Sequence, residues 1–249
     1  MASESDELAA NRKDGVKIWY PVLLDLEGKP CLVVGGGRVA ERKARTLLEA
    51  GANVTVVSPQ LTPQLEAWAA EGLIRTQRQE FISGLPVLAQ ARLVFAATGD
   101  AEVNAQVCAE AEALGKLVNS ADDAEAGGFI VPAILRRGRL TLAVSTAGAS
   151  PALAAKVRRQ LEDVFGEEYS PYLELMHELR MTVQAVVSDT TERQELFRAM
   201  LAWELLPLFK SGELPNDRFR SELLRRVAED PTTEGIRSIG DWLLRLRDS

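Results

Sequence analysis

The residues of this chain with the clearest chemical meaning form a glycine-rich turn at residues 35–40. Their order, GGGRVA, fits the pattern G-x-G-x-x-[GA], in which the first glycine permits a tight turn and the second lets the backbone approach a pyrophosphate. The small last residue allows a helix to pack closely on a strand, and the N–H groups at the start of that helix attract phosphate. The sequence therefore predicts a dinucleotide-binding turn made by Gly35, Gly37, Arg38, Val39 and Ala40.

Two further segments are expected to line the same cleft. A dinucleotide site commonly holds the ribose hydroxyls with an acidic residue at the end of the second strand, but here that strand ends at Ser58, Pro59 and Gln60. We therefore expect Ser58 or backbone groups to hold the ribose, and the lack of an arginine suited to a 2′-phosphate favours NAD over NADP. Thr98, at the end of the fourth expected strand, should line the nucleotide cleft.

Strand and helix patterns alternate through the first half of the chain, which is typical of a parallel sheet covered on both faces. Helical patterns occupy residues 38–50, the segment opened by Thr62-Pro63, and residues from Asp100 to about Leu114. Short apolar runs bounded by turn residues predict strands that begin at Cys31, Asn53, Ile74, Leu93 and Lys116. The sequence thus predicts an α/β protein with a Rossmann-type parallel sheet domain.

The pattern changes after Asp122. Two short strands are expected, FIVPAI from Phe129 and LTLAVST from Leu140, separated by a turn-like segment at residues 136–139. Ser150-Pro151 then resembles the start of a helix, and the chain is helical in pattern from there to its end. The expected domains are a floppy tail (1–17), the Rossmann-type domain (18–121), a small strand-containing dimerisation segment (122–150) and a helical C-terminal domain (151–249).

Composition excludes several classes of protein. The formal net charge of −7 argues against a nucleic-acid-binding protein, which needs a surplus of lysine and arginine. No apolar run approaches the length of about 18 residues that spans a bilayer, and the polar start of the chain does not resemble a signal peptide. We expect a cytoplasmic protein without membrane contact, in which Cys31 and Cys108 are buried, reduced thiols.

Three segments in the same order resemble the precorrin-2 dehydrogenase family. They are VVGGGRVAERKARTLLEAGANVTVVSP, FAATGDAEVNAQV and NSADDAEAGGFIVPAILRRGRLTLAVSTAGASPALA. The same unit forms the N-terminal part of bifunctional and trifunctional sirohaem synthases. The resemblance runs from about Tyr20 to about Phe165, and more loosely to about Met200.

The resemblance implies a reaction and a catalytic residue. NAD would remove a hydride from precorrin-2 to give sirohydrochlorin, and the family is typically a homodimer that exchanges its middle segment. The family's catalytic aspartate follows the fifth strand and falls on Asp122 of this chain. A carboxylate at a strand's carboxyl end could take a proton or accept pyrrole N–H bonds. Asp123 is the alternative carrier, and a turn-capping aspartate is the purely structural interpretation of Asp122.

A loop of small residues and a group of cations are candidates for substrate contact. The loop at residues 145–151 enters a helix whose N–H groups could meet carboxylates of precorrin-2. Arg136, Arg137, Arg139, Lys156, Arg158 and Arg159 gather positive charge near it, although each could equally be a solvated surface residue. The expected substrate-binding residues are Ser145, Thr146, Ser150, Arg136, Arg137 and Lys156.

Other functions were weighed against this interpretation. A His- and Cys-based metal site is not expected, because His177 is the only histidine. A short-chain reductase is excluded, because no tyrosine is followed by a lysine four positions later. An enzyme that also inserts ferrous iron, and a non-enzymatic NAD-binding regulator with a helical tail that binds a partner, remain as alternatives.

Overall fold

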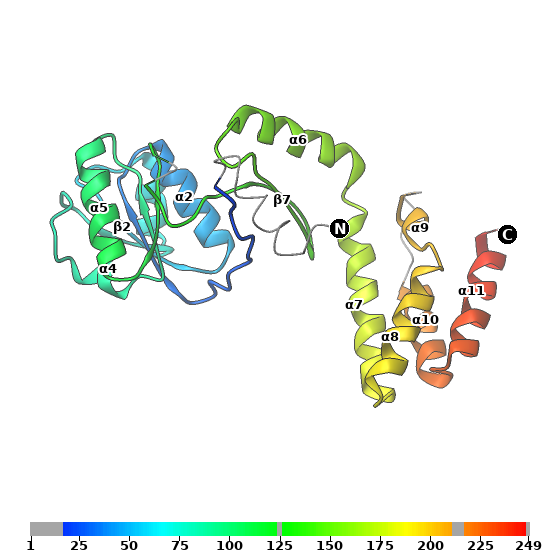
Figure 1. Cartoon of the computed structure of the whole chain (residues 1–249). Helices are drawn as coiled ribbons and strands as arrows, with labels where there is room; N and C mark the ends of the chain where they lie inside the picture. Colours follow the sequence, from blue (N-terminus) through cyan, green and yellow to red (C-terminus); the bar gives the residue numbers. More distant parts are fainter. Residues whose placement is uncertain (1–16, 124–125, 211–216, 248–249) are drawn as a thin grey trace, which may run out of the picture. The chain divides into compact units, whose positions relative to one another are not determined.

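The computed structural model describes residues 17–123, 126–210 and 217–247. These residues form two compact units (Figure 1). The first unit contains the described residues up to Val131 together with Thr146–Ser150, and the second contains Pro132–Ser145 and the described residues from Pro151 onward.

The first unit is built on a parallel sheet of five strands in the order β3-β2-β1-β4-β5. The strands are β1 (Pro30–Val34), β2 (Asn53–Val57), β3 (Ile74–Gln77), β4 (Leu93–Ala96) and β5 (Leu117–Ser120). This order is that of the first five strands of a dinucleotide-binding sheet. All four pairings are parallel, so the carboxyl ends of the strands lie along one edge.

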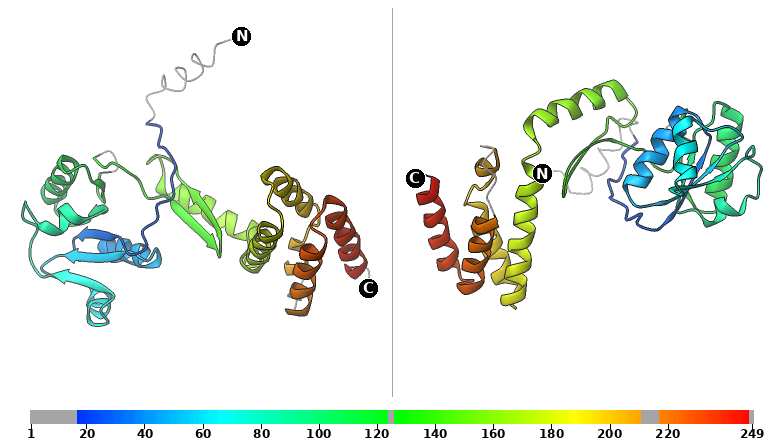
Figure 2. Two further views of the ribbon diagram at one scale, coloured as in Figure 1. Left: turned by 90° about the horizontal axis from the view of Figure 1, so that it is seen from below. Right: turned by 180° about the vertical axis from the view of Figure 1, so that it is seen from behind.

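Both faces of this sheet are covered by helices, which explains why its strands are continuous apolar runs. Along β1, Val33 packs in a core with residues of α2 and α3, whereas Leu32 and Val34 pack in a second core with residues of α4 and α5. Figure 1 and Figure 2 show these helices on either side of the strands. The helices are α2 (Arg38–Glu49), α3 (Pro63–Ala70), α4 (Pro86–Gln90) and α5 (Ala101–Ala113).

The expected fold class of this unit is confirmed. The expected strands and helices also begin within one residue of the observed ones. Thr62 caps α3 by accepting a hydrogen bond from Leu65 N, and Asp100 caps α5 through Glu102 N and Val103 N. Cys31 and Cys108 are buried free thiols. The short helix α4 was not predicted, because its five residues are too few to show a helical period.

The antiparallel hairpin of the second unit differs from the expected one. Its strands are β6 (Ala133–Arg137) and β7 (Leu140–Val144), so the strand expected to start at Phe129 is wrong in position. Phe129 packs edge-on against Phe95 at 5.4 Å between ring centroids, and its carbonyl accepts a hydrogen bond from Asn119 Nδ2 (3.0 Å). These contacts hold residue 129 in the first unit. The expected turn at 136–139 is shorter too, because Arg137 pairs directly with Leu140.

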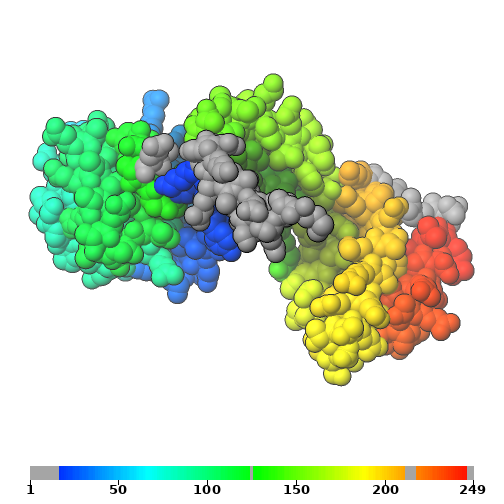
Figure 3. All heavy atoms as spheres, viewed as in Figure 1, coloured from blue at the N-terminus to red at the C-terminus, as the bar shows by residue number. Residues whose placement is uncertain are grey.

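The remainder of the second unit is helical, as expected. Buried side chains of its last five helices form one core, in which Trp203 also donates a hydrogen bond from Nε1 to Ile236 O (3.0 Å). The outer atoms of these helices range in colour from yellow-green through yellow and orange to red in Figure 3. The helices are α6 (Pro151–Val164), α7 (Tyr169–Val186), α8 (Thr190–Leu201), α9 (Leu206–Lys210), α10 (Asp217–Glu229) and α11 (Thr233–Arg247).

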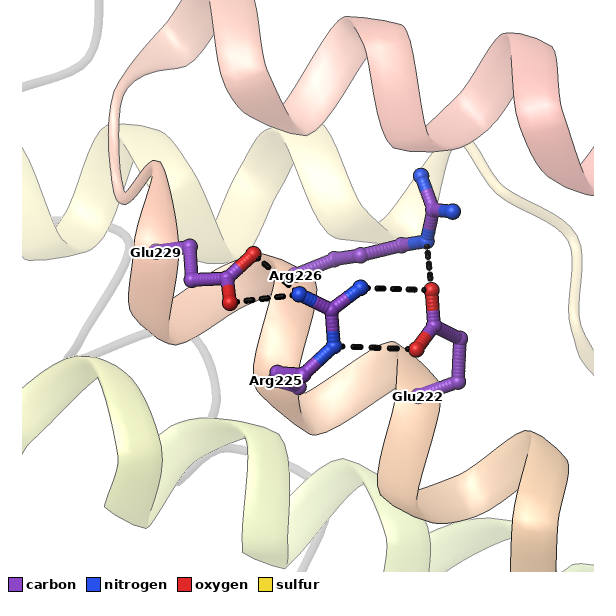
Figure 4. A network of polar contacts seen from close by, with 4 residues as sticks. All are labelled: Glu222, Arg225, Arg226 and Glu229. Carbon is purple, nitrogen blue, oxygen red and sulfur yellow. Dashed lines mark hydrogen bonds and ion pairs between the residues drawn. The ribbon is translucent and has the colours of Figure 1, made fainter.

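Helices α10 and α11, near the end of the chain, pack on preceding helices of their own unit. Helix α10 contacts α7, and α11 contacts α8, through the apolar faces of the two segments. The opposite face of α10 is charged: Arg225 forms a two-point ion pair with Glu222, which also accepts a bond from Arg226 (Figure 4). These bonds lower the pKa of Glu222 to about 2. Such exposed pairs contribute little to stability, and burial of the apolar face holds the helices in place.

Among the described helices, none combines the length and apolar character that crossing a bilayer requires. The tail expected at residues 1–17 lies outside the described residues except for Lys17.

One prediction tests the packing of the helical unit. Leu196 of α8 is fully buried, whereas Leu201 of the same helix is 63% exposed. We expect Leu196→Ala to lower the free energy of unfolding by about 2–5 kcal/mol, because it leaves a cavity in the core. The control Leu201→Ala should change it by about 0.5 kcal/mol or less. Urea denaturation followed by circular dichroism measures both; equal losses would contradict the described packing.

Candidate functional site: the carboxyl edge of the parallel sheet

A cavity of about 740 Å³ lies at the carboxyl edge of the sheet, within the first unit. Its walls are the glycine-rich turn after β1, the segment after β2, two residues after β3 and the segment after β4. Ligands of open α/β sheets bind in this crevice, where the strand order changes direction between β1 and β4. The cavity therefore occupies the place where a dinucleotide is expected.

The first two glycines of the turn are required by the closeness of neighbouring backbone. Gly35 has φ +121° and donates its N–H to Val57 O (2.9 Å), and a Cβ at this position would collide with Ala97 O. A Cβ at Gly36 would collide with Gln60 O. The role of Gly36 was missed in the sequence, because the motif treats this position as variable and the contact is made by a distant segment.

Gly37 differs from these two glycines, because no protein atom lies within 4 Å of where its Cβ would be. It is the N-cap residue of α2, and no side chain caps this helix. The first N–H groups of α2 are thus left for another acceptor, unlike those of α3 and α5. Arg38 and Val39 line the cavity beside Gly37, whereas Ala40 is fully buried under the helix. This arrangement suits an anion at the N-terminus of α2.

The β2 side of the cavity contains the residues expected near the ribose and one acid that sequence reasoning missed. Ser58, Pro59 and Gln60 line the cavity, with Ser58 Oγ donating to Gln60 O (2.8 Å). Glu80, which follows β3, lines the same cavity and makes no hydrogen bond or ion pair with the described residues. The sequence could have indicated Glu80, because it follows the third expected strand. In such sheets β3 lies beside β2, so an acid just after β3 can take the place of one after β2.

Asp122 follows β5 on the other side of the same edge. Its Oδ1 accepts a hydrogen bond from Ser120 Oγ, and its Oδ2 accepts one from Asn104 Nδ2 (2.9 Å). These two bonds lower the pKa of Asp122 below its ordinary value, because they stabilise the ionised form. Asn104 in turn bonds to Thr98, a residue of the cavity wall. The carboxylate is exposed, ionised and connected to the cavity.

The neighbouring Asp123 has a local structural role. Its Oδ1 accepts a hydrogen bond from Ala126 N (3.2 Å), as an aspartate at a turn commonly does. This contact favours Asp122 over Asp123 as the carboxylate that faces a ligand.

The six residues expected to bind the substrate are divided between the two units. Thr146 and Ser150 belong to the first unit, where Thr146 Oγ1 accepts a hydrogen bond from Ser150 N (3.0 Å). Ser145, Arg136, Arg137 and Lys156 belong to the second. Neither compact unit alone gathers all six, so their joint role in binding a substrate stays a prediction.

The cations of the second unit differ in the hydrogen bonds and ion pairs that they form within the protein. Arg137 donates to Phe165 O (3.1 Å) and pairs with Glu167 (3.2 Å), so its guanidinium links β6 to the loop between α6 and α7. Arg139 pairs with Glu174 (2.8 Å), and Arg158 pairs with Glu162.

Lys156 and Arg159 of α6 are exposed and have no partner among the described residues. Spaced three residues apart, they lie on one side of the helix. Among the six cations expected to contact the substrate, these two are the most available to a polycarboxylate.

A metal centre was not expected, and the described residues contain no group of three or more His, Cys, Asp or Glu side chains that could hold a metal ion. His177 lies within α7.

The fold and the cavity together define an NAD(P)-binding protein of the Rossmann type. The family model described as "Putative NAD(P)-binding" matches residues 22–133, and the one described as "Sirohaem biosynthesis protein central" matches residues 137–163. The expectation of a nicotinamide dinucleotide cofactor is thereby confirmed. By these matches the chain is similar to siroheme synthases and to a precorrin-2 dehydrogenase.

Individual relatives agree with this placement. A siroheme synthase of Chromobacterium violaceum is 39% identical over 210 residues, which is 84% of this chain and 44% of the relative. One from Edwardsiella ictaluri is 38% identical over 188 residues, which is 76% of this chain and 40% of the relative. The chain thus spans less than half of these relatives. The solved structure of SirC, a precorrin-2 dehydrogenase, matches with a TM-score of 0.63 and 29% identity, covering 90% of this chain and 99% of SirC.

Gly37 provides a test of the cofactor site. We expect Gly37→Asp to lower NAD affinity by about 100-fold or more, because like charges brought together cost several kcal/mol. The fold should be kept, because the space beside Gly37 is open and its φ of −85° suits any residue. Titration calorimetry with NAD and thermal unfolding measure the two effects.

Gly37→Ala is the graded control, since it adds a methyl group without charge. Undiminished NAD affinity in Gly37→Asp would show that the pyrophosphate does not lie at the start of α2.

Proposed function

We propose that this protein is a precorrin-2 dehydrogenase, which uses NAD to oxidise precorrin-2 to sirohydrochlorin. The observation that carries the proposal is the ionised carboxylate of Asp122, which is linked through Asn104 to the wall of the dinucleotide cavity. The near-complete coverage of the precorrin-2 dehydrogenase SirC supports it. The similarity to siroheme synthases over 188–210 residues supports it as well.

The residues of this chain fit the parts of that reaction. Bound NAD supplies the acceptor for the hydride. The free N–H groups at the start of α2 hold its pyrophosphate, and Arg38 adds a positive charge on the same wall. The loss of a hydride leaves positive charge on the macrocycle, which a fixed carboxylate stabilises. Asp122 is placed to do this and to accept pyrrole N–H bonds.

The lowered pKa of Asp122 distinguishes between its two possible roles. A proton acceptor works best when its pKa lies near the working pH, whereas the bonds from Ser120 and Asn104 hold Asp122 in the ionised form. We therefore assign Asp122 mainly as an anion that stabilises the oxidised macrocycle. Protons lost from the substrate pass on to water.

The choice of NAD over NADP follows from the charges on the cavity wall. Glu80 has no partner among the described residues and lies on the side of the cavity next to β2 and β3. A carboxylate there accepts hydrogen bonds from the ribose hydroxyls and repels a 2′-phosphate. It performs the task for which the end of β2 offers no acid.

Assembly and location are extensions of the proposal. A cytoplasmic homodimer is the state that the family resemblance implies, and the exposed cations of α6 suit the carboxylates of precorrin-2.

The decisive experiment mixes the purified protein with precorrin-2 and NAD and follows the absorbance of NADH. Bound NAD without turnover would favour the regulator alternative. Cobalt insertion into sirohydrochlorin without NAD would establish the chelatase alternative.

Asp122 is the first residue to test in this assay. We expect Asp122→Ala to lower kcat by about 100-fold or more, the size of effect seen when a charge-stabilising group is removed. NAD affinity should be nearly unchanged, because Asp122 does not line the cofactor cavity. The control Asp123→Ala should keep its activity. Loss of activity in Asp123→Ala alone would move the assignment to that residue.

The lowered pKa adds a pH criterion. An ionised group whose pKa is depressed keeps its charge until the pH falls through that pKa. Wild-type activity should therefore show no loss from protonation of Asp122 between neutral pH and the ordinary range of an aspartate, which a pH–rate profile measures.

Glu80 is tested by cofactor preference. We expect Glu80→Arg to raise the ratio of NADP affinity to NAD affinity by about 100-fold, because a repulsive charge is replaced by an attractive one. Glu80→Gln should give a smaller shift in the same direction. Glu71→Arg, which changes an exposed glutamate outside the cavity, is the control. Affinities measured by calorimetry that keep the wild-type ratio in Glu80→Arg would overturn the assignment.

A further inference from the structure

Asn104 is a buried polar residue on an otherwise apolar face of α5. It is 1% exposed and lies on the face of α5 that also buries Val107, Cys108 and Ala111 in the core. Burying an amide is costly unless its hydrogen bonds are satisfied. The hydrogen bonds of this amide therefore show what it does in the fold.

The amide is satisfied by two residues. Its Oδ1 accepts bonds from Thr98 N (3.0 Å) and Thr98 Oγ1 (2.8 Å), while Nδ2 donates to Thr98 O (3.3 Å) and to Asp122 Oδ2 (2.9 Å). The bonds to Thr98 allow only one orientation of the amide, because a flipped amide would point its N–H groups at the N–H of Thr98. The remaining N–H is thereby aimed at Asp122.

Asp122 needs such a partner because its side chain is exposed and would otherwise rotate freely. Ser120 Oγ holds one carboxylate oxygen and Asn104 holds the other. Each oxygen keeps further lone pairs for a ligand. Since Thr98 is part of the cofactor cavity, the network holds the carboxylate in a defined place relative to the cofactor.

We propose that Asn104 is a positioning residue of the active site, which orients the Asp122 carboxylate toward the substrate by a hydrogen bond fixed from the cofactor wall. The inference rests on the proposed dehydrogenase function for its effect on turnover. It does not rest on that function for its effect on the carboxylate itself.

The test is Asn104→Asp, which keeps the shape of the side chain and makes its donor depend on pH. Two carboxyl groups this close share a proton, so one of their pKa values rises strongly. Below that pKa the proton donates to Asp122 as the amide does, and above it two negative charges repel each other. Activity of the variant should therefore rise as the pH is lowered through this pKa, whereas wild-type activity should not rise there.

Other titratable groups around Asp122 do not produce the same signal. Asp123 and Glu112 act with Asp122 on the Cys108 thiol, whose pKa is raised chiefly by burial. Lys43 of α2 donates to Asn119 Oδ1 (3.1 Å). Wild type and variant both contain Asp123, Glu112, Cys108 and Lys43. A rise in activity that appears only in the variant as the pH is lowered is therefore caused by the introduced carboxyl group.

The control is Asn53→Asp, which removes an amide that donates to Gly28 O (2.9 Å) at the amino end of β2. It should show the wild-type pH profile. At neutral pH we expect Asn104→Asp to lose about 100-fold in kcat, the scale of loss when a reacting group is misplaced, with NAD affinity changed far less. A flat profile with wild-type kcat would overturn the proposal.

Two further measurements test the proposal if wild type shows no turnover or if the variant does not fold. If wild type does not turn over, carbon NMR titration of the Asp122 carboxyl still applies: a raised, coupled pKa in Asn104→Asp supports the contact, and an unchanged one refutes it. If Asn104→Asp does not fold, Ser120→Ala removes the other bond to Asp122. Under the proposal it lowers kcat and leaves the KM for NAD unchanged; an unchanged kcat shows that the carboxylate needs no fixed orientation.

Discussion

The close approach of three backbone segments at the carboxyl edge of the sheet is the constraint on which the site depends. The turn after β1 lies so near to Ala97 and Gln60 that neither Gly35 nor Gly36 has room for a Cβ. This closeness brings the N-terminus of α2 to the middle of the edge. Burial of Ala40 holds it there, since a larger side chain would lift the helix off the strands.

The strand order then distributes the chemistry along the edge. Because β2 and β3 lie on one side of β1, their ends carry the residues that suit a ribose, including Glu80. Because β4 and β5 lie on the other side, their ends carry Thr98 and Asp122. The two carboxylates are thus separated by the positive end of α2, and each can act on a different part of the bound molecules.

The second unit is organised by a different principle. Its helices have apolar faces that are buried against each other, and its charged faces form exposed ion pairs such as that of Arg225 with Glu222. Exposed pairs of this kind add little free energy. The unit therefore depends on packing for its stability, and the exposed cations of α6, Lys156 and Arg159, remain available for charge recognition.

Much of this protein is determined by local sequence. The turn at residues 35–40, the capping residues Thr62 and Asp100, and the apolar runs of the strands each act over a few neighbouring residues, so their pattern is visible without a structure. The family resemblance and the position of Asp122 were likewise visible. The tertiary structure decided what depends on contacts between distant segments. These are the close approach of Gln60 that leaves no room for a Cβ at Gly36, the place of Glu80 in the cavity wall, the packing of Phe129 on Phe95 and the bond from Asn104 to Asp122. No local pattern encodes these contacts, because each partner satisfies its own helix, strand or turn equally well before the chain folds.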